Sequence, residues 1–279
     1  MKRYIYLLLG IGGLLGAALA CNPVGGGGQA ATAEALALSI EQTATAAAEA
    51  NINAEALVQT AQAEATARSQ QIDATLAAQE AQAGEAAAAT ATAIAPILAE
   101  LPTYGVDPSE GQPGWIHPPL TLDVEGYLQY DYANYFIGTL VSDFVVAADI
   151  TWDTTTGLAG CGFVLRSDGN EDAINEYMVI ASRGGNGTVF FITQTNGSFF
   201  RQQNIPAGRV DPAFEWQNNT TNRIAVVARG DTFTLYTNGT RIGEVTDSTY
   251  NRGFVAMVAL SESGRTVCEF DNAWLWSLD

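Results

Sequence analysis

Two residue types that often carry chemistry are almost absent from this 279-residue sequence. Lysine occurs once, at Lys2, and histidine occurs once, at His117. The 12 basic residues are outnumbered by 30 acidic ones, and the resulting formal net charge of -18 repels the phosphates of nucleic acids. The composition therefore argues against nucleic acid as a partner. The single imidazole argues against a histidine-based triad and against a zinc site that needs a second histidine.

The chain also has only three cysteines, and the first of them follows an apolar amino terminus. Lys2 and Arg3 precede an uncharged apolar run over residues 4–19, which is the pattern of a cleaved signal peptide. Cys21 follows the small residues that end this run and precedes a glycine run at 25–28. This arrangement resembles the lipobox of bacterial lipoproteins, although Ala18 stands where that motif most often has leucine.

The resemblance implies a protein that is lipid-anchored to a bacterial membrane and lies outside the cytoplasm. We expect a signal peptide at residues 1–20, a lipid on Cys21 and a glycine-rich tether over residues 21–28. Two or more acyl chains anchor a protein stably, because each buried methylene contributes about 0.8 kcal/mol. The membrane is therefore an expected partner, and an uncleaved anchor helix is the alternative.

The other two cysteines are expected to form a disulfide, because an even pair in an oxidising compartment favours one. Cys161 lies in strand phase with Phe163 and Leu165, so its side chain should point into the core. Cys268 should also point inward, in phase with the aromatic residues Phe270, Trp274 and Trp276. On neighbouring strands the two residues can bridge with little distortion, and two buried thiols are the alternative.

Residues 29–100 form a low-complexity segment rich in alanine, threonine, glutamine and glutamate. Alanine, glutamine and glutamate favour helix, and a full helix over most of this segment would be about 100 Å long. The few large apolar residues keep no single heptad register, although abundant alanine lets helices approach closely. We therefore expect a stalk, with three arrangements open: a homo-oligomeric coiled coil, a single helix, or a partly disordered tether.

The composition changes twice more along the chain. Residues 101–119 are rich in proline and glycine, which end helices and favour extended backbone, so this segment is expected to be a linker. Residues 120–279 contain short runs of alternating apolar and polar residues, with no helical period. In the run over 144–152, alternate residues share one apolar face, namely Phe144, Val146, Ala148, Ile150 and Trp152.

Turn signals separate these runs. Asn-Gly pairs at 186–187, 196–197 and 238–239 favour the left-handed backbone of two-residue hairpins. Many short strands separated by such turns are typical of two packed antiparallel sheets. The expected fold class is all-β, a two-sheet antiparallel jelly-roll sandwich over residues 120–279, preceded by the alanine-rich stalk.

Several turn and core positions of residues 120–279 resemble a known superfamily. They include Asp143-Phe144, Gly162-Phe-Val-Leu-Arg166, Tyr236-Thr-Asn-Gly239, Gly253-Phe254 and Phe270-Asp-Asn272. The pattern is similar to that of the concanavalin A-like lectin/glucanase superfamily, and within it to laminin G-like and 3-keto-disaccharide-hydrolase-type domains. The resemblance implies the sandwich fold, and it implies no particular activity.

Retaining glucanases of this superfamily carry an E-x-D-x-x-E motif that places two carboxylates on one face of a strand. The nearest match is Glu269-Phe-Asp271, and Trp274 occupies the third acidic position. Glu269 and Asp271 share a strand face and are the candidate catalytic pair, with two solvated carboxylates as the alternative. The incomplete motif favours a protein that is not an enzyme.

Two further groups of residues are candidate ligand contacts. Laminin G-like domains often bind Ca²⁺ at a loop, and oxygen ligands are closely spaced at Asp168, Asn170 and Asp172, with a polar turn as the alternative. No other cofactor is expected. Four aromatic residues near predicted loops are candidates for stacking on sugar rings, with packing as the alternative: Trp115, Tyr135, Trp216 and Tyr250.

Three functions remain open from the sequence. The first is a non-catalytic, surface-displayed β-sandwich that binds a carbohydrate or a protein. The second is an enzyme that cleaves glycosides or keto-disaccharides with Glu269 and Asp271. The third is a structural envelope protein that forms homo-oligomers through its stalk.

Overall fold

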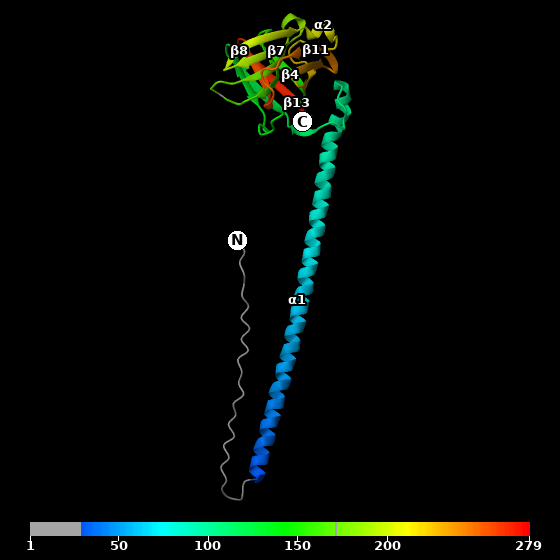
Figure 1. Cartoon of the computed structure of the whole chain (residues 1–279), viewed down its shortest axis with the longest axis vertical. Helices are drawn as coiled ribbons and strands as arrows, with labels where there is room; N and C mark the ends of the chain where they lie inside the picture. The colour runs from blue at the N-terminus through cyan, green and yellow to red at the C-terminus, as the bar shows by residue number, and fades with distance from the viewer. Residues whose placement is uncertain (1–28, 171) are drawn as a thin grey trace. The chain divides into compact units, whose positions relative to one another are not determined.

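The computed structural model describes residues 29–170 and 172–279 (Figure 1). The predicted signal peptide at 1–20, the lipid on Cys21 and the tether at 21–28 lie outside the described residues. The chain divides into two units between Gln82 and Ala83, and each unit is described by itself.

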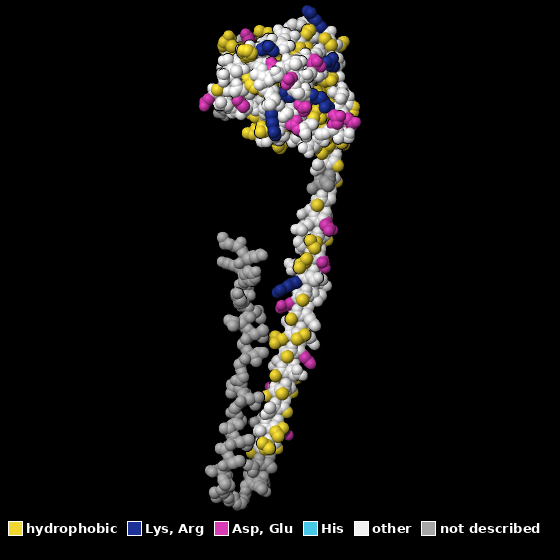
Figure 2. All heavy atoms as spheres, viewed as in Figure 1, with side chains coloured by type: hydrophobic (Ala, Val, Ile, Leu, Met, Phe, Trp, Pro, Cys, Tyr) yellow, Lys and Arg dark blue, Asp and Glu magenta, His cyan; other side chains and the backbone are white. Residues whose placement is uncertain are grey.

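The first unit contains most of a long helix, α1 (Gln29–Glu100), whose last turns belong to the second unit. Every described side chain from Ala35 to Gln82 is exposed, and Figure 2 shows apolar and acidic side chains interspersed along the helix. Threonine is a weak helix former, but six threonines of the described helix bond their Oγ to the carbonyl oxygen four residues earlier. The stalk segment is helical over Gln29–Glu100, which its alanine, glutamine and glutamate content favours.

By length and composition alone, the stretch Ala35–Tyr104 also meets the requirements for a membrane-spanning helix. Its apolar character comes mainly from alanine, and acidic residues recur along it at Glu41, Glu49, Glu55 and Glu64. The last turns of α1 pack on a β-sheet within the second unit. These features favour a stalk over a membrane span.

The second unit is a sandwich of two antiparallel sheets, as the sequence predicted. Sheet A contains, in spatial order, β1 (Gln112–His117), β13 (Arg265–Ser277), β4 (Phe144–Thr154), β9 (Thr221–Arg229), β10 (Thr232–Thr237) and β11 (Thr240–Thr246), and β2 (Leu120–Glu125) also pairs with β13. Sheet B contains β3 (Gln129–Ala133), β12 (Phe254–Ser261), β5 (Gly160–Ser167), β6 (Glu176–Ser182), β7 (Thr188–Thr195) and β8 (Ser198–Ile205). Short helical turns complete the unit: η1 (Leu101–Tyr104), η2 (Gly184–Asn186) and α2 (Ala207–Val210).

The core lies between the two sheets. The alternating residues of β4 face into it, as their phase predicted, from Phe144 at one end to Trp152 at the other. A disulfide joins Cys161 to Cys268, with 5.7 Å between the two Cα atoms, and both residues are buried. Cys161 is on β5 of sheet B and Cys268 on β13 of sheet A, so the bridge links facing sheets rather than neighbouring strands.

The predicted inward orientation of Trp274 and Trp276 is wrong. The register of β13 against β4 shifts between Asp271 and Trp274, and Asn272 adopts a positive φ of 49° there. This bulge reverses the alternation, since Ala273 and Leu275 enter the core while both tryptophans move to the outer face of sheet A. There they are covered by the end of α1 and by η1, through Ile97, Leu101 and Tyr104.

The interpretation of residues 101–119 as a linker is also wrong for much of that segment. Gln112–His117 forms β1, which pairs with β13 at the edge of sheet A. An edge strand tolerates proline, because one side of its backbone needs no ladder hydrogen bond, and the register shifts between Pro113 and Trp115. Leu101 and Tyr104 of η1 are buried on the same sheet, so the second unit begins well before residue 120.

Two of the three predicted Asn-Gly turns close two-residue hairpins. Asn196-Gly197 links β7 to β8 and Asn238-Gly239 links β10 to β11, with positive φ at each of the four residues. The third pair, Asn186-Gly187, also has positive φ but lies at the end of a longer loop that contains η2. The prediction of a two-residue hairpin at 186–187 is therefore wrong.

An ion pair holds the last turn of α1 on sheet A. Arg223 of β9 donates from Nε to Glu100 Oε1 at 2.7 Å and from Nη2 to Glu100 Oε2 at 2.8 Å. Tyr104 and Trp274 also donate hydrogen bonds to the Glu100 carboxylate. Burial alone would raise the pKa of Glu100, but these donors and the Arg223 charge hold that pKa below its ordinary value.

Replacing Arg223 by alanine is expected to lower the free energy of unfolding by about 2 kcal/mol, because it leaves the partly buried Glu100 without its cation. The matched control is Arg229→Ala, which removes an arginine from an ion pair with Glu110 whose side chains are 48% and 52% exposed. The free energy of unfolding of Arg229→Ala should fall by less than about 1 kcal/mol, because exposed ion pairs contribute little. Denaturant unfolding of both variants measures the difference, and equal losses would contradict the clamping role of Arg223.

Candidate functional site

Sheet B is curved toward its outer face, away from the core. Tyr130 lies on β3, and Gln194 lies on β7, four steps across the sheet. In a flat sheet with strands about 4.8 Å apart, their backbones would be about 19 Å apart. Yet Gln194 Nε2 donates a hydrogen bond to the Tyr130 hydroxyl oxygen at 3.1 Å. The sheet therefore curls around its outer face and forms a concave surface, which we call the sheet B groove.

The floor of the sheet B groove is apolar and closed to solvent. Buried side chains from four strands form it: Val164, Met178, Ile180, Phe190, Ile192, Phe254, Ala256, Val258 and Leu260. Tyr130 and Tyr132 of β3 pack against this cluster, and the Tyr132 ring lies 5.8 Å from the Phe254 ring, centroid to centroid. Aromatic side chains of the chain itself therefore line the groove.

Two hollows adjoin this aromatic pair. One, of about 330 Å³, is lined by Tyr130, Asp131, Tyr132 and Ile174. The other, of about 440 Å³, is lined by Phe254 together with residues of the loops 137–140, 167–169 and 252–253. These hollows lie beside the aromatic side chains that pack against the groove floor.

Glu176 stands at the start of β6, at one end of the sheet B groove. Its side chain is 0% exposed, and among the described residues neither carboxylate oxygen has a hydrogen-bond partner. Burial raises the pKa of Glu176 to about 7, the nearby Ser167 hydroxyl lowers it in part although it does not meet hydrogen-bond geometry, and the charge of Asp168 raises it further. A buried carboxylate without a partner destabilises a fold, and such groups are found at functional sites.

Gln194 is the ladder partner of Glu176 on β7. Its Nε2 is bonded to Tyr130, whereas its Oε1 is buried and has no partner within the described part of the chain. At the other end of β6, Ser182 Oγ is likewise buried without a partner in that part. The groove thus combines an aromatic and apolar surface with hydrogen-bonding groups that the chain does not use.

The structure does not bring the four predicted aromatic residues together. Trp115 is buried in the core between the sheets, and Trp216 and Tyr250 are partly buried against the same core. Tyr135 is 66% exposed and stacks on His117, with 4.5 Å between the ring centroids. Tyr135 is the most exposed of the four, so stacking on a sugar stays a prediction for Tyr135.

His117 has no free ring nitrogen for a metal or for a triad. Its Nδ1 lies 2.7 Å from the Pro118 carbonyl oxygen, and its Nε2 accepts a hydrogen bond from the Tyr135 backbone N–H at 3.3 Å. The side chain is also buried. This residue therefore stabilises the loop that follows β3.

Glu269 and Asp271 lie on the outer face of sheet A, and both are exposed. Asp271 is the ladder partner of Asp149, whose carboxylate is bonded to Arg223 and Asn272. The general acid of a glycosidase needs a raised pKa, which burial supplies. The exposed pair lacks that burial, so its catalytic role stays a prediction without support from the geometry.

The proposed calcium loop is closed by its own hydrogen bonds. Asp168 Oδ1 accepts from the backbone N–H groups of Asn170 and Asn175, and its Oδ2 accepts from Asn175 Nδ2. Burial alone would raise the pKa of Asp168, but these bonds keep it below its ordinary value. Asn170 Oδ1 accepts from the Asp172 backbone N–H at 3.3 Å. Among the described residues no cluster of three histidines, cysteines or acids is placed to hold a metal.

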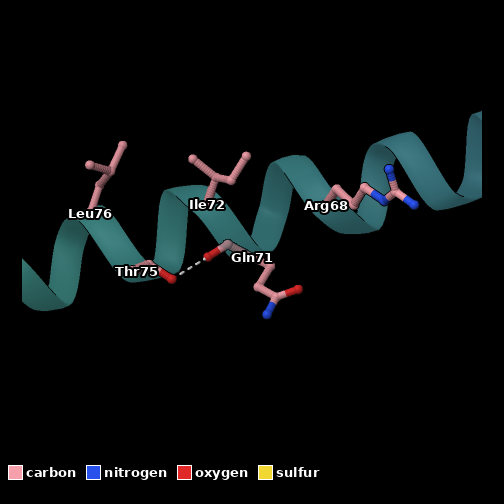
Figure 3. Close-up of a pocket in the computed structure, with 5 residues that line it drawn as sticks. All are labelled: Arg68, Gln71, Ile72, Thr75 and Leu76. Atoms are coloured by element: carbon pink, nitrogen blue, oxygen red, sulfur yellow. Dashed lines mark hydrogen bonds between the residues drawn. The ribbon is translucent and has the colours of Figure 1, made fainter. Parts of the chain in front are cut away.

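Two other hollows are weaker candidates than the sheet B groove. Figure 3 shows the first, of about 340 Å³, whose lining side chains Arg68, Gln71, Ile72, Thr75 and Leu76 all project from α1. A space bounded by one exposed helix encloses no ligand. The second, of about 500 Å³, lies beside Arg223 and Trp274. Its Arg223 donors are already bonded to Glu100, Asp149 and the Asn272 carbonyl oxygen.

Sequence reasoning placed no function on Glu176, Gln194 or Tyr130. The sequence shows only a glutamate at the start of a predicted strand, and glutamate side chains are usually exposed to solvent. The burial of Glu176 depends on the curvature of sheet B, which brings β3 and β7 together across the groove.

The fold and the groove define the second unit as a jelly-roll β-sandwich. The chain is similar to the carbohydrate-binding module CBM66 from Bacillus subtilis, with 18% identity, a TM-score of 0.41, and coverage of 60% of this chain and 97% of the module. It is also similar to a β-glucanase from Bacillus licheniformis, with 11% identity, a TM-score of 0.40, and coverage of 60% and 96%. A third similar structure is the galectin LEC-6 from Caenorhabditis elegans, with 16% identity, a TM-score of 0.34, and coverage of 59% and 93%. No protein-family model and no curated protein matches the sequence.

Proposed function

We propose that the protein is a non-catalytic carbohydrate-binding protein of the bacterial cell exterior, with its ligand site in the sheet B groove. The observation that carries this proposal is the pairing of aromatic and apolar walls with buried polar groups that have no partner among the described residues. A sugar ring offers apolar C–H faces and hydroxyl groups at once, and both kinds of surface have counterparts in the groove.

The location of the protein is part of the same proposal. A lipid on Cys21 would hold the chain on a membrane, and the Cys161–Cys268 disulfide supports an oxidising compartment outside the cytoplasm. The 72 residues of α1 would serve as the stalk between the lipid and the sandwich. Pairing of that stalk with a second copy remains a prediction.

The proposed ligand site is tested by measuring how the full chain binds carbohydrates in mild detergent. Binding is measured first on a glycan array and then by calorimetric titration. Tyr130→Ala is expected to weaken the affinity for a bound glycan about ten-fold or more, because it removes an aromatic wall of the groove. Tyr135→Ala is the matched control, since it removes an exposed tyrosine from the loop after β3 and should leave the affinity unchanged.

Three results would count against this proposal. If the protein binds no glycan, the proposed carbohydrate-binding function is wrong. Loss of binding in Tyr135→Ala but not in Tyr130→Ala would move the site from the sheet B groove to the exposed loop. If shorter sugars are released during incubation, the protein is a hydrolase and not a non-catalytic binding protein. Glu176 would then be the first candidate for the general acid, because its pKa is about 7.

A further inference from the structure

One end of the sheet B groove is rich in acceptors and poor in donors. The two carboxylate oxygens of Glu176 and the Oε1 of its ladder partner Gln194 are buried and have no partner among the described residues. The donor side of Gln194 is already bonded to the Tyr130 hydroxyl. A ligand that satisfies this end must therefore bring N–H or O–H donors of its own.

No cation among the described residues neutralises Glu176. Within the described residues, each arginine that pairs with an acid within 4.0 Å does so with a carboxylate other than Glu176. A metal ion would need several oxygen ligands, and among the described residues no such cluster exists. The buried negative charge thus calls for a positive group supplied by a ligand.

We infer that the Glu176 end of the groove recognises a free amino group on the bound carbohydrate, so that the ligand is an amino sugar with an unacetylated amine. An ammonium group has three N–H donors and one positive charge, which matches the three acceptor oxygens, two of which carry the negative charge of Glu176. A hydroxyl group offers a single donor and no charge. An acetylated amine also has one donor, and its acetyl group adds bulk. This inference rests on the proposed carbohydrate-binding function.

The path to these acceptors runs past Tyr130. Tyr130 lines the hollow of about 330 Å³, and its hydroxyl is also bonded to Gln194. Ile174, two residues before Glu176, lines the same hollow. The hollow therefore lies on the side of the groove where Tyr130 bonds to Gln194, the ladder partner of Glu176.

The test uses three tetrasaccharides with the same β-1,4-linked backbone, which differ only at the second carbon of each ring. These are the glucosamine tetramer, the N-acetylglucosamine tetramer and cellotetraose. We expect the full chain to bind the glucosamine tetramer at least ten-fold more tightly than the other two at pH 7.5. Glu176→Gln should abolish this preference, so that the variant binds the three tetramers with affinities within about two-fold of one another.

Non-specific attraction needs its own control, because a chain with a net charge of -18 attracts any cationic oligosaccharide. Glu269→Gln removes the same charge from an exposed position on sheet A and should keep the full preference. A preference that survives in Glu176→Gln, or that Glu269→Gln reduces equally, overturns the inference. Equal binding of all three tetramers overturns the inference and leaves the carbohydrate-binding function standing. Binding of none of them, with a blank glycan array, overturns both.

Discussion

Replacing Cys161 and Cys268 together by alanine is expected to lower the free energy of unfolding by about 4 kcal/mol. The bridge closes a loop whose ends are 107 residues apart, so its loss restores a large conformational entropy to the unfolded chain. It also joins β5 of one sheet to β13 of the other, so it ties together the two layers that enclose the core. Denaturant unfolding, monitored by tryptophan fluorescence, measures the change.

Reduction of the wild-type protein provides an independent check on the disulfide. Both cysteines are buried, so a thiol reductant should act only on unfolded molecules. In the presence of reductant, the wild-type unfolding midpoint should fall close to that of the Cys161→Ala/Cys268→Ala variant, whose own midpoint should not move. A variant as stable as the wild type would show that packing alone holds the sheets together.

The sequence correctly predicts the side-chain orientation of residues for which that orientation depends only on local alternation. Phe144 and Trp152 face the core because β4 runs through both without a shift in the register of their side chains. Asn196-Gly197 and Asn238-Gly239 form tight turns because the required positive φ is a property of the residues themselves. Cys161 and Cys268 were correctly placed inward by phase, but phase carries no information about which strands face each other.

Two of the wrong predictions about the fold share one physical cause, which is the β-bulge. At Asn272 one extra residue reverses the alternation, so a rule that predicts Cys268 and Phe270 correctly fails for Trp274 and Trp276. A second shift, in β1, lets a segment with proline and glycine join the edge of sheet A. In both places the sequence shows the pattern of apolar residues, but it does not predict the shift in backbone register.

The candidate site was missed for a different reason. Glu269 and Asp271 are the predicted catalytic pair because they match part of a known motif, yet they lie exposed on sheet A. Glu176 matches no motif, and its burial comes from the curvature that lets Gln194 bond to Tyr130, 64 residues away in the sequence. Curvature of a whole sheet depends on many strands at once, and alternation within a single strand does not reveal it.

Replacing Glu176 by glutamine is expected to stabilise the protein at pH 8 by about 3 kcal/mol and to have no effect at pH 4. The pKa of Glu176 is about 7 in the folded protein, against an ordinary value of 4.5 that applies to the unfolded chain. Below pH 4.5 the carboxyl is protonated in both states and makes no difference to stability. Between pH 4.5 and about 7 only the unfolded chain releases the proton, so the wild type loses stability as the pH rises.

The difference between variant and wild type isolates this effect, because carboxylates with lowered pKa values, such as Glu100 and Asp247, act in the opposite direction in both proteins. Glu269→Gln is the matched control at an exposed position and should change the free energy of unfolding by less than about 0.5 kcal/mol. A Glu176→Gln variant that is no more stable at pH 8 than at pH 4, relative to the wild type, would mean that Glu176 has a partner in solution. If the gain is found, the same carboxylate destabilises the empty groove at neutral pH and gains a favourable interaction when a cationic ligand neutralises it. Stability given up at a binding site in this way is the expected cost of a preformed recognition group.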